Sequence, residues 1–360
     1  MHIALIAPPW LSVPPAAYGG TESVLDTLAR GLCAAGHQVV LAATGDSTCP
    51  VPRTWVYEHS MVDKLGSVTV ELRHVLHAYA SIGDVDIVHD HTIAGPVLSA
   101  GLTKAPVVTT NHGPFTDDAV AIYRSVTPRV AIVAISHDQA SRSQSVPIAR
   151  VIHHGLNVAD FPFGNGAGGY LAFLGRMSPT KGVREAIEIA RRAGVPLLIA
   201  AKMREQSERE YFDTVVKPCL GGDVQYLGDV GRADKLELLG NAIALVDPIR
   251  WDEPFGLCMI EALACGTPVL VTPRGAAPEI VDDGVTGFVR PTLDELVSFV
   301  PRVASLDRRA CRAAAECRFS AGRMAEAHIA LYDDVINRRI DDAPVPIRRR
   351  LDAGRSRATA

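Results

Sequence analysis

The segment Trp251–Glu261 carries two carboxylates at a point where a strand is expected to give way to a helix. An apolar run that ends at Asp247 predicts a buried strand, and a helical pattern begins near Gly256. Glu253 lies on the loop between them, whereas Glu261 lies about five residues into the helix, roughly 7–8 Å from its start. The spacing therefore indicates two carboxylates that address opposite ends of one ligand.

The expected start of this helix is itself a binding feature. The first backbone N–H groups of a helix have no partner within it, and the helix dipole adds a partial positive charge there. The amides of Phe255, Gly256, Leu257 and Cys258 are therefore expected to face an anion. A diphosphate would suit such a site.

Two cations follow the apolar run 170–174, which predicts another strand. Arg176 and Lys181 belong to the block LGRMSPTKG, residues 174–182, and are expected on the loop after that strand. An arginine fork and a lysine point charge both suit a diphosphate. They would stabilise it as a leaving group in the absence of a metal.

Weaker signals come from glycines and histidines in the first half of the chain. Gly19 and Gly20 follow a strand pattern, where a loop without side chains lets backbone amides approach a phosphate. His89 and His91 are expected on one face of a strand, which is compatible with metal ligation. No further Cys, Glu or His cluster completes such a set in the sequence, so we expect no metal site.

The scaffold predicted for these residues has two similar halves. Strand and helix patterns alternate from residue 2 to about residue 135, and the alternation restarts at residue 170 after the flexible, glycine-rich stretch 164–169. This alternation predicts parallel sheets with helices on both faces. We expect an α/β protein with two doubly wound, Rossmann-like domains, residues 1–165 and 166–320, that face a central cleft.

The C-terminal residues are predicted to be helical from about 305 to 340. We expect the helix 321–340 to cross back to the first domain. The tail 341–360 is rich in Pro and Arg and is expected to be mobile. From residue 338 onward the chain has seven arginines and three aspartates, for which a solvated tail is favoured over contact with a membrane surface or nucleic acid.

Composition narrows the class of protein. The chain has 360 residues, 48% of them hydrophobic, and a formal charge of −4, which gives material for two cores and argues against a nucleic-acid binder. Seven cysteines without a Cys-x-x-Cys pair argue against a disulfide framework and for a reducing compartment. The sequence shows neither a signal peptide nor 18 consecutive apolar residues, so a cytoplasmic location without a membrane span is expected.

Together these blocks resemble the retaining glycosyltransferases of family 4, which have the GT-B fold. The resemblance covers nearly the whole chain. Its most specific parts are the spacing of Glu253 and Glu261, the block FLGRMSPTKG, and GTPVLVTPRGAAPEIVDDGVTGFV at residues 266–289. It implies an enzyme that transfers a glycosyl group from a nucleotide-sugar and needs no metal.

The resemblance also implies roles for single residues. Glu253 would lie near the transferred sugar, and Glu261 would hold the ribose of the nucleotide. Arg176 and Lys181 would bind the diphosphate. His112, in the sequence VVTTNHGPF, would lie near the sugar and the bond that breaks, so His112 and Glu253 are the expected catalytic pair.

Further donor contacts are implied at the edges of both domains. Gly19 and Gly20 would meet the far side of the diphosphate. Backbone around Lys202, Met203 and Val230 would hold the base. The block HHGLN, residues 153–157, departs from the family's Asn-Gly-(Val/Ile)-Asp.

The acceptor is expected mainly against the first domain, near Tyr18 and His91. The expected reaction moves a hexose, by default glucose from a UDP-sugar, to the hydroxyl of a sugar, a lipid-linked sugar or a small molecule. The sequence leaves the acceptor, the base and the oligomeric state open. Alternatives are another GT-B enzyme, such as a nucleotide-sugar epimerase or a phosphorylase, and a non-catalytic nucleotide-sugar-binding protein.

Overall fold

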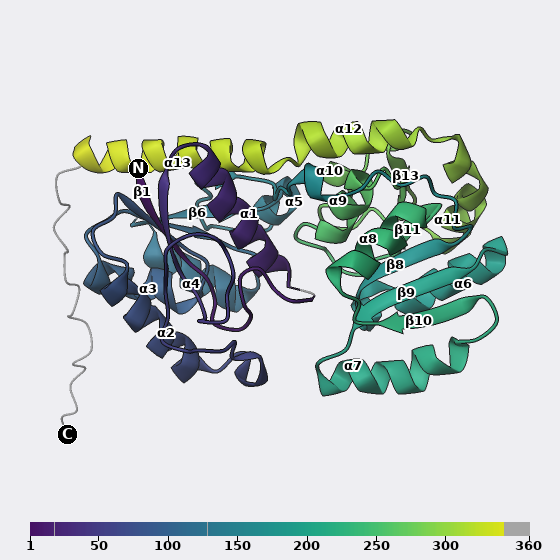
Figure 1. Ribbon diagram of the computed structural model, residues 1–360, viewed down its shortest axis with the longest axis horizontal. Helices are drawn as coiled ribbons and strands as arrows, with labels where there is room; N and C mark the ends of the chain where they lie inside the picture. The colour runs from purple at the N-terminus through teal and green to yellow at the C-terminus, as the bar shows by residue number, and fades with distance from the viewer. Residues whose placement is uncertain (18, 128, 342–360) are drawn as a thin grey trace, which may run out of the picture.

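The computed structural model describes residues 1–17, 19–127 and 129–341. These residues form two α/β lobes, one from each half of the chain (Figure 1). Each lobe is built on its own parallel sheet, seven-stranded in the first and six-stranded in the second. The predicted class, two doubly wound domains, is confirmed; the boundary at residues 165 and 166 stays a prediction.

The first sheet has the strand order β3-β2-β1-β4-β5-β6-β7. Its strands are β1 (His2–Ile6), β2 (Gln38–Ala42), β3 (Arg53–Thr54), β4 (Ile87–Asp90), β5 (Val107–Thr110), β6 (Val130–Ala134) and β7 (Arg150–Val151). Its helices are α1 (Gly20–Ala34), α2 (Val68–Ser81), α3 (Ala94–Leu102), α4 (Asp117–Val126) and α5 (His137–Ser141), with the short helices η1 (Val62–Lys64) and η2 (Val158–Asp160). Helices cover both faces, so the central strands are buried apolar runs.

The second sheet has the order β10-β9-β8-β11-β12-β13. Its strands are β8 (Leu171–Arg176), β9 (Leu197–Lys202), β10 (Val224–Gly228), β11 (Ala244–Asp247), β12 (Val269–Val271) and β13 (Gly287–Val289). The helices are α6 (Val183–Ala193), α7 (Gln206–Tyr211), α8 (Arg232–Asn241), α9 (Leu257–Ala264), α10 (Ala277–Ile280), α11 (Leu293–Phe299) and α12 (Arg308–Arg318), with η3 (Pro179–Lys181), η4 (Phe212–Val216), η5 (Lys217–Cys219) and η6 (Val300–Ser305). In both sheets the order reverses beside the first strand, and such reversals place ligands at the carboxyl ends of the strands.

The last helix, α13 (Ala321–Asp341), returns to the first domain as predicted (Figure 1). It packs along α1, where a Cβ on Gly31 would lie 3.0 Å from the Cβ of Ala325. Tyr332 of α13 is fully buried, and its hydroxyl lies 2.7 Å from Nδ1 of His89 in β4. The helical stretch predicted for residues 305–340 consists of two helices in the structure, since α12 ends at Arg318 and a short crossing precedes α13.

Two chain segments cross between the domains here, one around Leu156 and one around Phe319–Ala321. The Leu156 amide donates to the Phe319 carbonyl at 2.9 Å, and the Ala321 amide donates to the Leu156 carbonyl at 2.9 Å. The two chain segments that pass between the domains are therefore hydrogen-bonded to each other. The Phe319 carbonyl and the Ala321 amide are thus used by the neighbouring segment at the break between α12 and α13.

The glycine-rich stretch 164–169 packs closely on the second domain, a role that the prediction of a flexible linker missed. The amides of Gly164 and Gly168 donate to the carbonyls of Cys265 and Asn241, both at 2.9 Å. A Cβ on Gly164 would lie 2.0 Å from the Gly240 carbonyl oxygen, so only glycine allows this approach.

The predicted tail 341–360 lies outside the described residues, apart from Asp341 at the end of α13. Within residues 1–17, 19–127 and 129–341, no helix has both the length and the apolar character needed to cross a membrane.

Candidate active site

Three glycines shape the loop that carries Glu253. A Cβ on Gly275, where φ is +56°, would lie 2.2 Å from the Glu253 carbonyl oxygen, which accepts a hydrogen bond from the Ala276 amide at 2.9 Å. A Cβ on Gly182 would lie 2.1 Å from the Pro248 carbonyl oxygen. Gly256, with φ of +103°, precedes α9. Close backbone approaches of this kind fix the loop against two neighbouring turns.

Glu253 and Lys181, predicted at different parts of one ligand, are paired in the structure. The Lys181 ammonium donates to Glu253 Oε2, and Trp251 Nε1 donates to the same oxygen at 2.8 Å. The side chains of Lys181 and Glu253 are 10% and 12% exposed. Lys181 Nζ also lies 5.5 Å from the centre of a Trp251 ring. A diphosphate at this site would therefore compete with Glu253 for the lysine.

Asp247 lies next to this pair at the end of β11, and sequence reasoning gave it no role. Its side chain is buried, and burial raises its pKa to about 7, although nearby Lys181 lowers it. Burial also raises the pKa of the Cys258 thiol, which stays protonated and lies 3.5 Å from Asp247 Oδ2. Two carboxylates thus share one lysine. An acidic residue that ends an apolar strand was the only sequence signal for Asp247.

Glu261 has a cationic partner that the sequence did not reveal. Lys235 of α8 lies with Nζ 2.5 Å from Glu261 Oε1. The two side chains are 23% and 17% exposed, so the pair borders solvent. A carboxylate held in this way can still accept hydrogen bonds from a vicinal diol, since each oxygen has more than one acceptor position.

The start of α9 faces the first domain. The helix begins at Leu257 after Gly256, and no described side chain caps it. A Cβ on Gly20 would lie 3.2 Å from Leu257 Cδ1, so the glycine pair Gly19–Gly20 and the helix start meet across the cleft. The segment Phe255–Cys258, whose amides are expected to face an anion, therefore lies beside the glycine loop, and the orientation of those amides stays a prediction.

Cations gather at the carboxyl ends of β8 and β9. Arg176 and Lys202 are the last residues of these strands and pair in register, whereas Arg176 was predicted on the following loop. Burial lowers the pKa of Lys202, and neighbouring Arg204 lowers it further. Burial raises the pKa of Glu22 on α1, and Lys202 and Arg204 offset part of that rise. The first turn of α1 and this cationic edge thus face each other.

The other residues predicted around the base lie at the same edge. Met203 follows β9 and Val230 follows β10, and both are half-buried against the apolar cores of the second domain. β9 and β10 are parallel neighbours, so the residues that follow them lie at the same edge of the sheet, where the strands end.

His112 follows β5 and links the first domain to the start of α9. Its Nε2 lies 2.8 Å from Nδ1 of His91, and its ring stacks on His154 at 5.2 Å between centroids. The His154 ring meets Phe255 edge-on at 5.1 Å. Burial lowers the pKa of His112 to about 4. At neutral pH this imidazole is therefore uncharged and acts through hydrogen bonds.

His91, predicted on the acceptor side, lies behind His112. It is 6% exposed, and its ring lies 4.0 Å from that of His89, between centroids. It therefore contacts His112 from the interior of the first domain. Tyr18, the other residue predicted on that side, lies outside the described residues.

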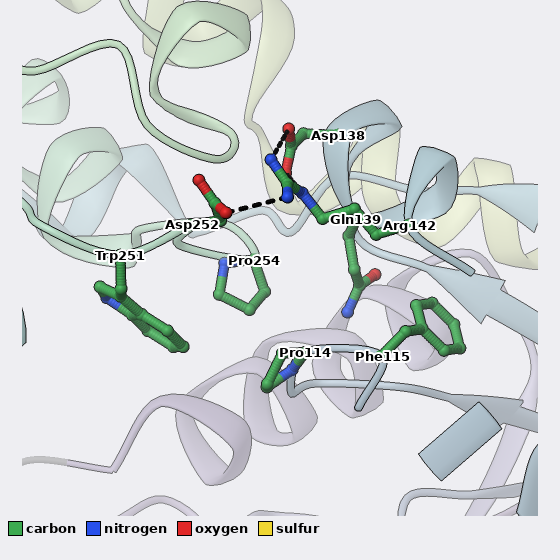
Figure 2. A pocket seen from close by; sticks show the side chains of 8 residues that line it. All are labelled: Pro114, Phe115, Asp138, Gln139, Arg142, Trp251, Asp252 and Pro254. Atoms are coloured by element: carbon green, nitrogen blue, oxygen red, sulfur yellow. Dashed lines mark hydrogen bonds and ion pairs between the residues drawn. The ribbon is translucent and has the colours of Figure 1, made fainter. Parts of the chain in front are cut away.

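A cavity of 270 Å³ opens between the domains beside both loops (Figure 2). Pro114 and Phe115 of the His112 loop line one side, and Trp251, Asp252 and Pro254 line the other. The volume is slightly below the roughly 300–1,000 Å³ of sites for drug-sized ligands. It is an adequate size for one sugar ring between the loops that carry His112 and Glu253.

Gln139 of α5 and Arg142, which follows α5, hold the loops around this cavity in place. Gln139 donates to the carbonyls of Asn111 and Gly113 at 2.9 and 2.6 Å, which fixes the backbone around His112. Arg142 Nη1 lies 2.8 Å from Asp252 Oδ2 across the domains (Figure 2). Neither residue was singled out from the sequence, because neither belongs to a motif.

Family models match most of the chain. The model described as Glycosyltransferase Family 4 matches residues 18–160, and that described as Glycosyl transferases group 1 matches residues 164–299. A phosphatidyl-myo-inositol mannosyltransferase from Mycolicibacterium smegmatis is 27% identical over 332 residues, 82% of each chain. A glycogen synthase from Mycobacterium tuberculosis is 25% identical over 76% of this chain and 79% of its own.

Solved structures agree. AviGT4, a glycosyltransferase involved in avilamycin A biosynthesis, has a TM-score of 0.72 at 26% identity and covers 93% of this chain and 98% of its own. Sucrose-phosphate synthase from Thermosynechococcus elongatus has a TM-score of 0.76 at 18% identity and covers 94% and 99%. HepE from Anabaena, solved with UDP-glucose, has a TM-score of 0.72 at 17% identity and covers 93% and 100%.

Two parallel-sheet domains facing a cleft, with these structural neighbours, define a glycosyltransferase of the GT-B class. The family matches on both halves place it further: the chain belongs to the family 4 glycosyltransferases.

Proposed function

We propose that this enzyme moves a hexose from a nucleoside diphosphate sugar to an acceptor hydroxyl with retention of anomeric configuration. The observation that carries the proposal is the cluster of Glu253, Lys181 and the open start of α9, which lies opposite Gly20 and is joined to His112 through stacked rings. An anion seated on the helix amides would lie beside a lysine that the protein already holds at the site.

The leaving group is the nucleoside diphosphate. In the proposed reaction the helix amides and Arg176 bind it, and Lys181 passes from the Glu253 carboxylate to the phosphate as charge develops there. These groups supply the positive charge, so the transfer itself needs no metal. Glu253, still held by Trp251 Nε1, then accepts hydrogen bonds from the sugar hydroxyls.

Retention follows if the acceptor attacks from the face that the phosphate leaves. The bond from the anomeric carbon to the phosphate oxygen breaks through an oxocarbenium-like state. The new bond forms to the acceptor oxygen on the same face, and the acceptor proton passes to the departing phosphate. Neutral His112 would donate or accept a hydrogen bond beside the sugar, since its low pKa keeps the imidazole uncharged.

The identities of the transferred sugar and of the nucleotide base are separate proposals. Glucose carried on UDP is our default donor. Mannose is the next candidate, because the M. smegmatis protein and other relatives are named mannosyltransferases. The acceptor would lie beside the cavity of Figure 2, against the first domain.

Calorimetric titration with UDP, GDP, ADP and the corresponding glucose and mannose donors tests the proposal. We expect one nucleotide series to bind, and we expect Glu261→Gln to weaken that binding about tenfold or more, with Glu316→Gln on α12 as the matched exposed control. Proton NMR of the same mixtures separates the alternatives, because an epimerase would convert the donor without an acceptor. If no nucleotide binds, the proposal fails.

A further inference from the structure

The Glu279 carboxylate contacts several groups of the first domain near the crossing segments. Glu279 belongs to α10 of the second domain, and α10 lies next to α5 of the first in Figure 1. Glu279 Oε2 accepts a hydrogen bond from the His137 amide at 2.8 Å, and Oε1 accepts one from the Asp138 amide at 2.6 Å. His153, which follows β7 in the first domain, has Nε2 2.8 Å from Glu279 Oε2.

The imidazole of His137 completes a three-residue group. The ligating atoms of His137, His153 and Glu279 all lie within 4.8 Å of one another. The two histidine rings are nearly perpendicular, at 89°, with centroids 5.8 Å apart. Ligand atoms bound tetrahedrally at about 2.0–2.1 Å lie roughly 3.3 Å apart. The exposed His137 ring would need to turn inward by an ångström or two.

The surroundings hold two of these ligands in place. Burial raises the pKa of Glu279, but hydrogen bonds from His153 and from the His137 and Asp138 amides outweigh it, so the carboxyl pKa is below its ordinary value. The Glu279 carbonyl accepts a hydrogen bond from Arg318, and the His153 carbonyl accepts one from Arg323. These two contacts fix the backbone from which the Glu279 and His153 side chains project.

Nearby charge limits the affinity without removing the site. Arg318 is paired with Asp282 at 2.6 Å, which reduces its effect on a bound cation. Arg323 is a second opposing charge, through its contact with the His153 carbonyl. Binding should therefore be weaker than at a structural zinc site with four ligands.

We propose that His137, His153 and Glu279 bind a divalent transition metal, zinc above all, and that the ion restrains movement between the two domains. Two imidazoles and one carboxylate suit zinc and leave one position for water, whereas magnesium prefers oxygen ligands. The site is separate from the proposed transfer chemistry, which uses no metal. The His153 ring lies 5.8 Å from Phe255, so a restraint here reaches the loop before α9.

Zinc titration of the full chain, stripped of metal with a chelator, tests the binding. We expect one zinc per chain, and a tenfold or greater loss of affinity in His137→Gln. That variant keeps the backbone amide that donates a hydrogen bond to Glu279, so the contact between the domains survives. The change in zinc affinity therefore reports on the imidazole alone. His59→Gln removes an exposed histidine elsewhere and should bind zinc like the unaltered protein.

Two results would overturn the site: His137→Gln and His153→Gln both binding zinc as tightly as the unaltered protein, or His59→Gln losing the same affinity. Hydrogen exchange tests the restraint without any donor. Zinc should slow exchange of the amides at the start of α5, and this slowing should be absent in His137→Gln. Zinc bound at the three residues with no change in exchange would refute the restraint. The binding does not depend on the proposed transferase reaction, so its failure is distinguishable.

Discussion

Replacing Lys181 with methionine removes a cation that pairs with Glu253 and lies close enough to Asp247 to lower its pKa. The side chains of Lys181 and Glu253 are only 10% and 12% exposed, so solvent screens their ion pair little. Removing one partner of a buried ion pair costs about 3–5 kcal/mol. Asp247 has a pKa of about 7 with Lys181 present, and it should take up a proton once the lysine is gone. That proton offsets part of the lost charge, so we expect a loss of about 3 kcal/mol in the free energy of unfolding.

The same substitution should slow donor turnover for a different reason. A preorganised donor to developing charge contributes about 10²–10³-fold in kcat, or about 2.7–4 kcal/mol. Urea unfolding measures the first effect, and release of nucleoside diphosphate from the preferred donor measures the second. Lys217→Met is the control, because Lys217 is paired with Asp213 on an exposed helical surface.

The double variant Lys181→Met/Glu253→Gln separates the two effects. Neutralising Glu253 removes the unpaired charge, so stability should recover by more than half while turnover stays low. Purely additive losses of stability, or turnover in Lys181→Met equal to that of the Lys217→Met control, would refute this reasoning.

Three further predictions concern single side chains. His91→Phe should lower kcat at least tenfold with little change in KM, because His91 positions His112 without reaching a ligand; equal changes in both constants would contradict this. Burial lowers the pKa of His112 and His328 to about 4, below their unfolded value of 6.5. The stability they contribute is therefore present above pH 6.5 and is lost as the pH falls through 4. His328→Leu should make the fall in melting temperature between pH 6.5 and 4 shallower, and an unchanged slope would count against it. Arg142→Leu should raise KM for the acceptor or donor more than it lowers stability, since its Asp252 contact holds the cavity loop; a normal KM would argue against that role.

The sequence was sufficient for the architecture because the relevant signals are local. The alternation of apolar strands and amphipathic helices predicts both sheets, and Gly266 marks the end of α9. Strand ends were less predictable. Arg176 lies in β8 because the backbone continues to pair with β9 as far as Lys202, and that pairing depends on a neighbour 26 residues away.

Partners of the predicted site residues were mostly invisible in the sequence. Lys235, which holds Glu261, and Asp247, which lies beside Lys181, belong to separate elements that only the fold brings together. The position of His91 was also beyond local reasoning, because the rings of His89 and His112 surround it in the folded domain. Motifs identify residues that touch a ligand, whereas the residues that hold them depend on tertiary packing.

In the proposed reaction the cleft breaks the sugar–phosphate bond of a nucleotide-sugar, with Arg176 and Lys181 facing the leaving group. The most direct test is the release of nucleoside diphosphate from UDP-, GDP- and ADP-hexoses, measured by ion-exchange chromatography with the unaltered enzyme and with Arg176→Met/Lys181→Met. We expect slow release from one donor series by the unaltered enzyme, unaffected by EDTA, and at least a hundredfold less by the folded double variant. Equal release by the two proteins would contradict it.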